Sequence, residues 1–260
     1  MRAKSLWIFY PSVQLHYAIN QNKELFEKMD NKIDKLPELN RDVVNTINAL
    51  NKDYDNPLEY DESKNVIFQS VGDRKYTLGV DFIGPSAFIA EMNGIDENSI
   101  FEFQYQSRIM GGHLLFPTDI YKVKSKPKSL NQIRSYRFEE RIDYFLFELS
   151  LFSVGKNKVE ASAGVFEGNR KWFEQFGKFP EFVDFFKLND FVSENYEVYD
   201  LSSLDDYGHM RFIQEQPDVK YKNDYKKALM EAYSHNYKNY IKGCVSAIQK
   251  RDERIKKLIG

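Results

Sequence analysis

The chain has 260 residues and a mass of 30.7 kDa, which is enough to bury a sizeable core in one large or two small domains. Hydrophobic residues at 42% and charged residues at 29% are typical of a folded chain, and 21 Phe and 17 Tyr predict an aromatic-rich core. The single Cys244 excludes an intramolecular disulfide and a thiolate zinc cluster, and the four His residues lack metal-ligand spacing, so we expect no metal and no cofactor.

Charge and hydropathy are distributed unevenly along the chain. Residues 220–260 contain eleven Lys and Arg against four Asp and Glu, whereas residues 181–218 contain ten acidic residues against two basic ones. These neighbours could neutralise each other in the fold, which competes with a nucleic-acid surface as the role of the basic tail. Because neither a signal peptide nor a membrane-length apolar run is visible, we expect a cytoplasmic protein without a membrane partner.

The first part of the chain is predicted to be helical. Residues 12–30 have apolar positions at roughly helical spacing, and residues 41–51 form a short helix with Val43, Val44, Ile47 and Leu50 on one face. The LPELN stretch at 36–40 contains a proline and is predicted to be a connector. The acidic segment 53–63 is predicted to be a loop, which closes the first helical unit.

A hairpin and a short helix follow. Residues 65–69 and 75–82 are predicted strands on either side of Gly72-Asp73, a pair that favours a tight turn. Pro85 fits the first turn of a short helix that ends at Gly94.

A second hairpin is predicted next. Residues 99–110 alternate Phe and Tyr with Glu and Gln, which is typical of a half-buried strand, and residues 113–116 form a short apolar strand after the Gly111-Gly112 break. Lysines alternate from 122 to 128, which predicts either an edge strand with one solvated lysine face or a basic lip beside the next helix.

A central helix is predicted from Ser129 to Phe152, because Ser129 and Gln132 have the spacing of a capping box. Its apolar face consists of Phe138, Ile142, Phe145, Leu149 and Phe152. On the flank of that face lie three arginines that we call the arginine stripe: Arg134, Arg137 and Arg141. Asp143 projects away from the stripe, so we expect it to cap or bridge a neighbouring element rather than to pair with an arginine.

The remaining chain is predicted to be mostly helical. Residues 155–169 are turn-rich, and a helix that begins at Pro180 presents Phe182, Phe185 and Phe186 to the core. Residues 224–258 are helical in composition, with Gly243 as a point that divides or bends the helix. The predicted fold class is α+β, with a small antiparallel sheet packed against a long central helix and C-terminal helices. We expect one domain over 1–260, with a helical unit at 1–60, a sheet region at 61–124 and a helical region at 129–260.

Four stretches carry a combined pattern: GGHLLFP at 111–117, the spaced Asn131, Arg134, Arg141 and Asp143, FEQFGKFPEFVDFFKLNDFV at 173–192, and RDERI at 251–255. Together they resemble a bacterial family of uncharacterised proteins that is defined by a domain of unknown function. The resemblance implies no activity. This chain has Glu140 where the family has Asp, and His113 where the family has an apolar residue, which argues against His113 as a catalytic residue.

The arginine stripe is the strongest candidate site. Guanidinium groups bind phosphate or carboxylate through paired hydrogen bonds and stay charged at all working pH values. Together with Asn131, the arginines at 134, 137 and 141 are the predicted ligand-binding residues. The alternative is that the stripe pairs with Glu148 and with carboxylates of the 181–218 segment and has a structural role.

No catalytic residue is predicted. Gly111-Gly112 lacks the strand-to-helix context of a phosphate-binding loop, and the adjacent carboxylates Glu139 and Glu140 would not face each other on a helix. The tyrosines between 221 and 240 interleave with lysines, a pattern that suits either single-stranded nucleic acid or a buried helix face with solvated hydroxyls.

We therefore expect a binding protein that recognises a phosphate-bearing ligand, a nucleotide or RNA, through the arginine stripe, with bacterial stress or phage defence as its setting. The sequence indicates neither an oligomeric state nor a reaction. One alternative is a metal-independent ribonuclease-like toxin, in which arginines stabilise the pentacovalent phosphate and a Tyr or Glu transfers protons. The other is an interaction module with no small ligand.

Overall fold

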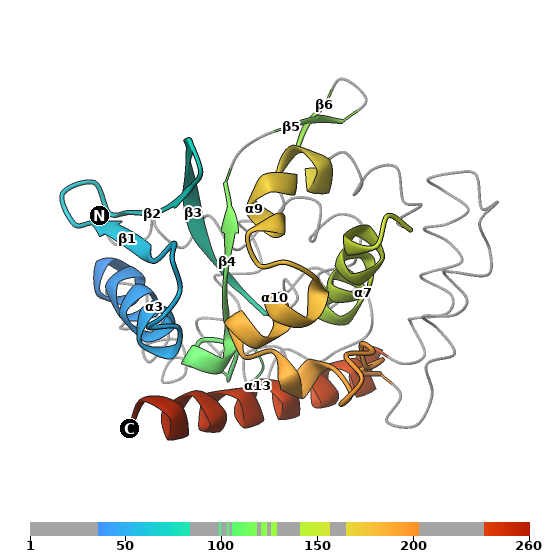
Figure 1. Ribbon diagram of the computed structural model, residues 1–260. Helices are drawn as coiled ribbons and strands as arrows, with labels where there is room; N and C mark the ends of the chain where they lie inside the picture. Colours follow the sequence, from blue (N-terminus) through green and yellow to red (C-terminus); the bar gives the residue numbers. More distant parts are fainter. Residues whose placement is uncertain are drawn as a thin grey trace, which may run out of the picture.

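A four-stranded antiparallel sheet and a set of helices make up the part of the chain that the computed structural model describes, namely residues 36–83, 99, 103, 106–118, 121–123, 126–128, 141–156, 165–202 and 237–260. The strand order is β1-β2-β3-β4, with α3 beside β1 and with α7, α9 and α10 on the other side of β4 (Figure 1). The predicted α+β class is confirmed. The predicted helices at 12–30 and 85–94 lie outside the described residues, and the single-domain division stays a prediction.

Helix α3 (Leu36–Leu50) begins earlier than predicted, because the LPELN stretch expected as a connector is its first turn. A proline near a helix start removes an N–H that has no intrahelical acceptor there, so Pro37 is compatible with the helix. Val43, Val44 and Ile47 are buried, as predicted.

Strand β1 (Leu58–Asp61) lies in the acidic segment that was predicted to be a loop, so that prediction is wrong. It pairs with β2 (Val66–Val71) from Leu58↔Gln69 to Asp61↔Val66. Asn48 of α3 holds the strand through both of its amide atoms: Nδ2 donates to the Leu58 carbonyl at 2.8 Å, and Oδ1 accepts from the Leu58 N–H at 2.9 Å. Acidic composition alone therefore does not exclude a strand that is fastened by a neighbouring helix.

Replacing Asn48 with Ala is expected to lower the free energy of unfolding by about 1–3 kcal/mol, because both backbone groups of Leu58 lose their partner. Urea denaturation followed by circular dichroism measures the change. Asn45→Ala is the matched control, since Asn45 is an exposed asparagine of the same helix. Equal losses for the two variants would contradict the role assigned to Asn48.

The first predicted hairpin is confirmed. Strand β2 pairs with β3 (Arg74–Phe82), and Gly72, with φ +61°, supplies the left-handed residue that the two-residue turn requires. On its other edge β3 pairs with β4 (His113–Pro117), from Leu78↔Pro117 to Phe82↔His113. All five residues of β4 are buried, so this strand lies at the centre of the fold.

The predicted strand over 99–110 is wrong. Ser99, Phe103 and Gln106, the described residues of its first part, are helical, and the Ser107 N–H donates to the Phe103 carbonyl at 2.9 Å. The partner of β4 is therefore β3 and not this segment. A short alternation of Phe with Glu and Gln is ambiguous, because Glu and Gln favour helices and tertiary contacts decide such cases.

The lysine-rich segment forms a two-stranded sheet of its own, made by β5 (Tyr121–Val123) and β6 (Lys126–Lys128). Tyr121 pairs with Lys128 and Val123 with Lys126. The expected single edge strand is thus a small hairpin, apart from the main sheet.

Three helices carry the aromatic core: α7 (Ile142–Ser153), α9 (Arg170–Glu174) and α10 (Phe179–Phe186). Phe182, Phe185 and Phe186 of α10 are buried, as predicted. Trp172 of α9 is fully buried, and its indole N–H donates to Gln69 Oε1 of β2 at 2.8 Å, which joins the helices to the sheet. Residues 165–168, at the end of the predicted turn-rich segment, are helical instead.

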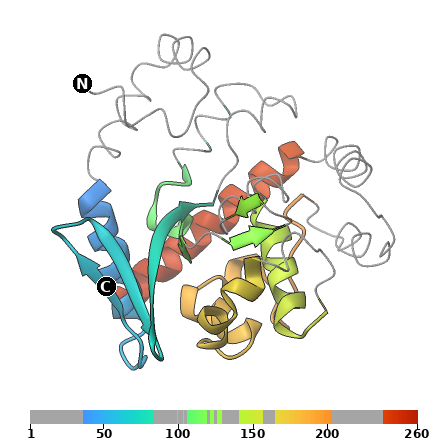
Figure 2. The ribbon, with the colours of Figure 1, turned by 90° about the horizontal axis from the view of Figure 1, so that it is seen from above.

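The last helix, α13 (Tyr237–Ile259), is continuous and runs along the base of the molecule (Figures 1 and 2). Gly243 does not divide it. A Cβ at this position would overlap the Leu201 carbonyl oxygen, so glycine is needed for the close approach of the 200–202 segment.

Candidate functional site

The structure describes one of the four predicted ligand-binding residues. Arg141 is the residue before α7, and its backbone is extended, with φ −73° and ψ 122°. The central helix therefore does not run unbroken from Ser129 to Phe152, although Ile142, Phe145, Leu149 and Phe152 form a buried face, as predicted. Asn131, Arg134 and Arg137 lie outside the described residues, so their ligand-binding role stays a prediction.

Arg141 is fully buried and bound by two carboxylates. Its Nε and Nη2 donate to Asp143 Oδ1 and Oδ2 at 3.0 and 2.5 Å, and Nη2 also donates to Asp200 Oδ1 at 2.9 Å. The rings of Tyr144 and Tyr240 lie 4.1 and 4.5 Å from the guanidinium carbon. We call these five residues the Arg141 node.

Asp143 contradicts one prediction and confirms another. The expectation that it would not pair with the stripe assumed a helical backbone at Arg141, and the extended backbone there brings the two side chains together. Asp143 Oδ2 also accepts from the Leu201 N–H at 3.0 Å, so this carboxylate bridges to a neighbouring segment, as predicted. The Ile142 N–H donates to the Tyr240 hydroxyl at 3.1 Å, and the node thereby joins α7, α13 and residues 200–202.

The electrostatics of the node favour a permanently charged arginine. Burial by itself lowers the pKa of Arg141, but the charges of Asp143 and Asp200 and the hydrogen bonds that Arg141 donates to Asp143 outweigh it, so the pKa lies well above its ordinary value. Asp200 belongs to the acidic 181–218 segment. For Arg141 the structure thus shows the structural alternative, pairing with a carboxylate of that segment.

A second buried arginine, Arg251 of α13, binds backbone carbonyls instead of carboxylates. It donates to the carbonyls of Gly111 and His113 at 2.6 and 2.8 Å, and twice to that of Phe186 at 2.9 and 3.1 Å. Asp252 accepts from the Gly111 N–H at 3.0 Å. Burial lowers the pKa of Arg251 to about 9, against the opposing charges of Asp190 and Asp252, so the guanidinium is charged at neutral pH.

The contacts of Arg141 and Arg251 involve much of the pattern that carried the family resemblance. Gly111, Phe186, Arg251 and Asp252, from three stretches of that pattern, meet around Arg251. A Cβ at Gly111 would overlap the Ile248 carbonyl oxygen, so the Gly-Gly pair is a point of close backbone approach. No local pattern indicates this role, because the contact joins positions more than 130 residues apart.

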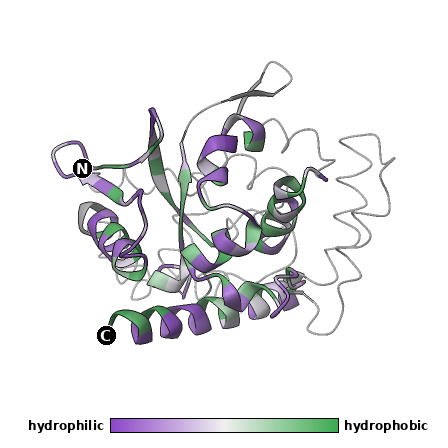
Figure 3. Ribbon diagram, viewed as in Figure 1, coloured by the Kyte–Doolittle hydropathy of each residue, from purple (hydrophilic) through white to green (hydrophobic). Residues whose placement is uncertain are grey.

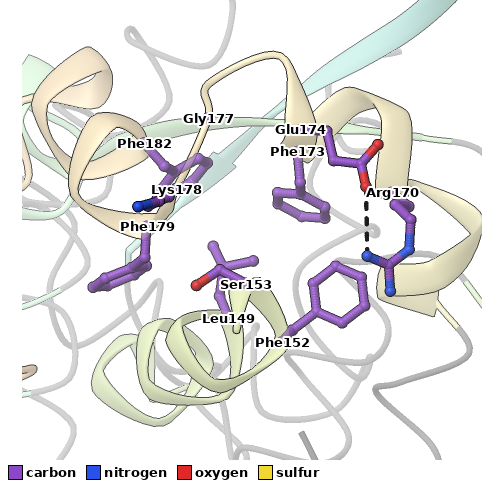
Figure 4. A pocket seen from close by; sticks show the side chains of 10 residues that line it. All are labelled: Leu149, Phe152, Ser153, Arg170, Phe173, Glu174, Gly177, Lys178, Phe179 and Phe182. Carbon is purple, nitrogen blue, oxygen red and sulfur yellow. Dashed lines mark hydrogen bonds and ion pairs between the residues drawn. The ribbon is translucent and has the colours of Figure 1, made fainter. Parts of the chain in front are cut away.

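An open pocket lies between the second half of α7 and the helices α9 and α10 (Figure 4). Its cavity volume is about 210 Å³. We call it the phenylalanine pocket, after the four rings that line it: Phe152, Phe173, Phe179 and Phe182. Its polar lining residues include Ser153, Arg170, Glu174 and Lys178. No sequence motif pointed to it, since aromatic residues at helical spacing predict a core in the same way.

The described part of the chain gives little support for a catalytic histidine, a tyrosine surface for nucleic acid or a metal site. His113 is buried, with its ring edge-on to Phe82 at 5.0 Å between ring centres. Tyr240 is a core residue, as the buried-face alternative for the tyrosines of the tail has it, but its hydroxyl is buried and accepts from the Ile142 N–H instead of being solvated. Within the described residues, no cluster of His, Cys, Asp or Glu could hold a metal ion, and no helix is long and apolar enough to span a membrane.

Two buried arginines, Arg251 between α13, α10 and the start of β4 and Arg141 between α7, α13 and residues 200–202, hold together an α+β protein. The chain belongs to a family of unknown function, DUF6994, whose sequence profile matches residues 13–255. The resemblance to a family of uncharacterised proteins is thereby confirmed. Neither a curated protein nor a solved structure is similar to this chain.

Proposed function

We propose that this protein binds a phosphate-bearing ligand, a nucleotide or RNA, through Arg134 and Arg137, with Asn131 as a neighbouring polar group. In this proposal Arg141 does not bind the ligand and has a positioning role. Its guanidinium is held by Asp143 and Asp200, so it positions the chain that carries the other two arginines. Paired hydrogen bonds from guanidinium groups suit phosphate oxygens.

The observation that carries the proposal is that most carboxylates of residues 181–202 already have hydrogen-bond or ion-pair partners. Side-chain partners already engage the carboxylates of the 181–202 stretch as follows: Asp184 with Asn189 and Tyr196, Asp190 with Arg254, and Asp200 with Arg141. Glu181 accepts from the backbone N–H of Lys178. In the described part of this stretch, only Glu194 and Glu197 remain exposed without such a partner. Within residues 181–202, two carboxylates are therefore left that could neutralise the other two arginines of the stripe.

Chain length keeps those arginines close to the anchored residue. Arg137 is four positions before Arg141 in the chain, so their Cα atoms lie within about 14 Å of each other, and the limit for Arg134 is about 25 Å.

The exposed lysines of α13 also favour a polyanion. Lys238, Lys242, Lys250 and Lys257 are exposed and have no ion pair among the described residues. Hydrophilic residues recur along this helix (Figure 3). The predicted neutralisation of the basic tail by the acidic segment holds for Arg254, which pairs with Asp190. These four lysines span about 28 Å of helix, which exceeds one nucleotide and suits a strand of RNA.

The double variant R134A/R137A tests the proposal. We expect weaker binding of a fluorescent single-stranded RNA and a salt dependence reduced by about 1.4 in the slope of log K against log salt, because each phosphate contact of a single strand contributes about 0.7. Fluorescence anisotropy at several salt concentrations measures both quantities. Intact RNA on a gel after the titration supports a binding protein, whereas cleavage favours the ribonuclease-like alternative.

The matched control is R41A/K52A, which removes two exposed positive charges from the region of α3. It should leave the affinity nearly unchanged. If both double variants weaken RNA binding equally, or if R134A/R137A lowers only the melting temperature, Arg134 and Arg137 are not the ligand-binding residues.

For the biological setting we propose the cytoplasm of a bacterium and a role in phage defence or stress, on the strength of the family resemblance alone. The test compares the plating efficiency of phage on cells that express the wild type with that on cells that express R134A/R137A. A plating efficiency that the protein lowers and the double variant restores supports this setting, and identical plating argues against it.

A further inference from the structure

The phenylalanine pocket has the features of a small-molecule site that is separate from the Arg141 node. It lies against Leu149, Phe152 and Ser153, in the second half of α7. Leu149 is eight residues beyond Arg141, which is about 12 Å along the helix axis. A ligand of one ring and one substituent in this pocket would therefore not depend on the Arg141 node.

The size of the cavity limits the ligand to one ring system. An engineered apolar cavity of about 150 Å³ holds a benzene molecule, and drug-sized ligands occupy pockets of about 300–1,000 Å³. At about 210 Å³, the phenylalanine pocket has room for one bicyclic ring, and a larger substituent must extend through the open side.

The walls of the pocket favour a planar aromatic ring. Phe173 lies 6.2 Å from Phe152 and 6.0 Å from Phe182, measured between ring centres, and these rings belong to the continuous aromatic cluster around Trp172. Packing into that cluster fixes their orientation. Offset and edge-on contacts with fixed rings favour a flat π-system over a branched aliphatic group.

Among the described residues of the rim, Lys178 is a cation without an ion pair and Glu174 is an available acceptor. Arg170 is held by Glu167 at 2.6 and 2.7 Å and lies 4.6 Å over the Phe152 ring, so its charge is already matched. Glu174 makes only a 3.5 Å contact with Arg170, which leaves its carboxylate able to accept a hydrogen bond. Lys178 is exposed and has no ion pair among the described residues. In Figure 4, Lys178 and the Arg170–Glu174 pair lie on opposite sides of the cavity.

We propose that the phenylalanine pocket binds an amino-substituted planar heterocycle that carries an anionic group, as in a purine nucleoside monophosphate. The ring lies among the four phenylalanines, its amino edge donates to Glu174, and the anionic group pairs with Lys178. Each part of the ligand meets side chains of matching chemistry. The apolar ring contacts the aromatic walls, the amino donor binds a carboxylate, and the phosphate binds an ammonium group.

Calorimetric titration with three probes tests the assignment: AMP, adenosine and ribose 5-phosphate. We expect AMP to bind one site in the R134A/R137A background, adenosine to bind about threefold to fivefold more weakly, and ribose 5-phosphate not to bind. Adenosine lacks the phosphate that pairs with Lys178, and the loss of one exposed ion pair weakens binding by about this factor. K178Q should reduce AMP affinity to that of adenosine and leave adenosine unaffected.

A pocket-filling variant and its neighbour complete the test. S153W places an indole at the cavity without removing a core residue, and V154W adds the same bulk at a position that is 59% exposed and does not line the pocket. S153W should abolish AMP binding, whereas V154W should retain it, with both variants unfolding as cooperatively as the wild type. The proposal is wrong if AMP does not bind at millimolar concentration, if S153W binds AMP normally, or if ribose 5-phosphate binds as well as AMP. Because S153W should leave RNA binding intact, failure of this site and failure of the arginine stripe are distinguishable.

Discussion

Arg141→Ala is expected to lower the free energy of unfolding by about 3–5 kcal/mol, the usual cost of removing one partner from a buried ion pair. The substitution leaves Asp143 and Asp200 buried without their cation, and it removes the group against which Tyr144 and Tyr240 pack. A domain of ordinary stability has about 5–15 kcal/mol in total, so this single change removes a large share of it. Urea denaturation should show the loss, and the melting temperature should fall by about 10 °C.

Arg170→Ala is the matched control, because Arg170 also forms a two-point pair with a carboxylate, Glu167, but on the surface. Exposed pairs contribute about 0–1 kcal/mol, so the control should unfold almost like the wild type. The double variant R141A/D200N should recover part of the stability that Arg141→Ala loses, since it removes one of the two buried carboxylates that have no cation in that variant. A loss below 1 kcal/mol in Arg141→Ala would show that the Arg141 node does not hold these segments together.

Local patterns predicted the parts of the fold that local interactions determine. The hairpin around Gly72 follows from turn chemistry, and the buried faces of α7 and α10 follow from apolar spacing. Phe103 shows the limit of this reasoning, because its alternating neighbours fit a strand while the described residues around it are helical. Periodicity over six residues does not decide between two structures when both can bury the same ring.

The candidate site was harder to predict, because its geometry depends on contacts between distant segments. Arg141 was placed correctly beside an apolar helix face, but its partner Asp200 lies 59 residues away, and no local signal links them. The assumption of one unbroken helix also misplaced Asp143 relative to Arg141. The phenylalanine pocket was missed for a different reason, since a ring that lines a cavity and a ring that fills a core have the same spacing.

Gly111→Ala is expected to separate α13 from the end of the sheet. The added Cβ would overlap the Ile248 carbonyl oxygen and lie 2.7 Å from the Asp252 nitrogen, and both are backbone atoms of α13. Neither side can yield easily, because Arg251 and Asp252 bind the backbone of Gly111 on the same helix face. Overpacking against backbone costs about 3 kcal/mol or more, so we expect α13 to open at least about 100-fold more often.

Cys244 reports this opening directly, since it is the single cysteine of the chain and is fully buried on α13. A thiol reagent should label the wild type slowly, through rare opening, and should label Gly111→Ala at least about 100-fold faster. Gly79→Ala is the control, because its Cβ would meet a side-chain methyl group of Thr118 at 3.0 Å rather than backbone atoms. The labelling rate of that variant should stay near the wild-type rate. Slow labelling of Gly111→Ala would mean that the Gly-Gly pair tolerates a side chain, and that the close approach of α13 is not what this part of the family pattern encodes.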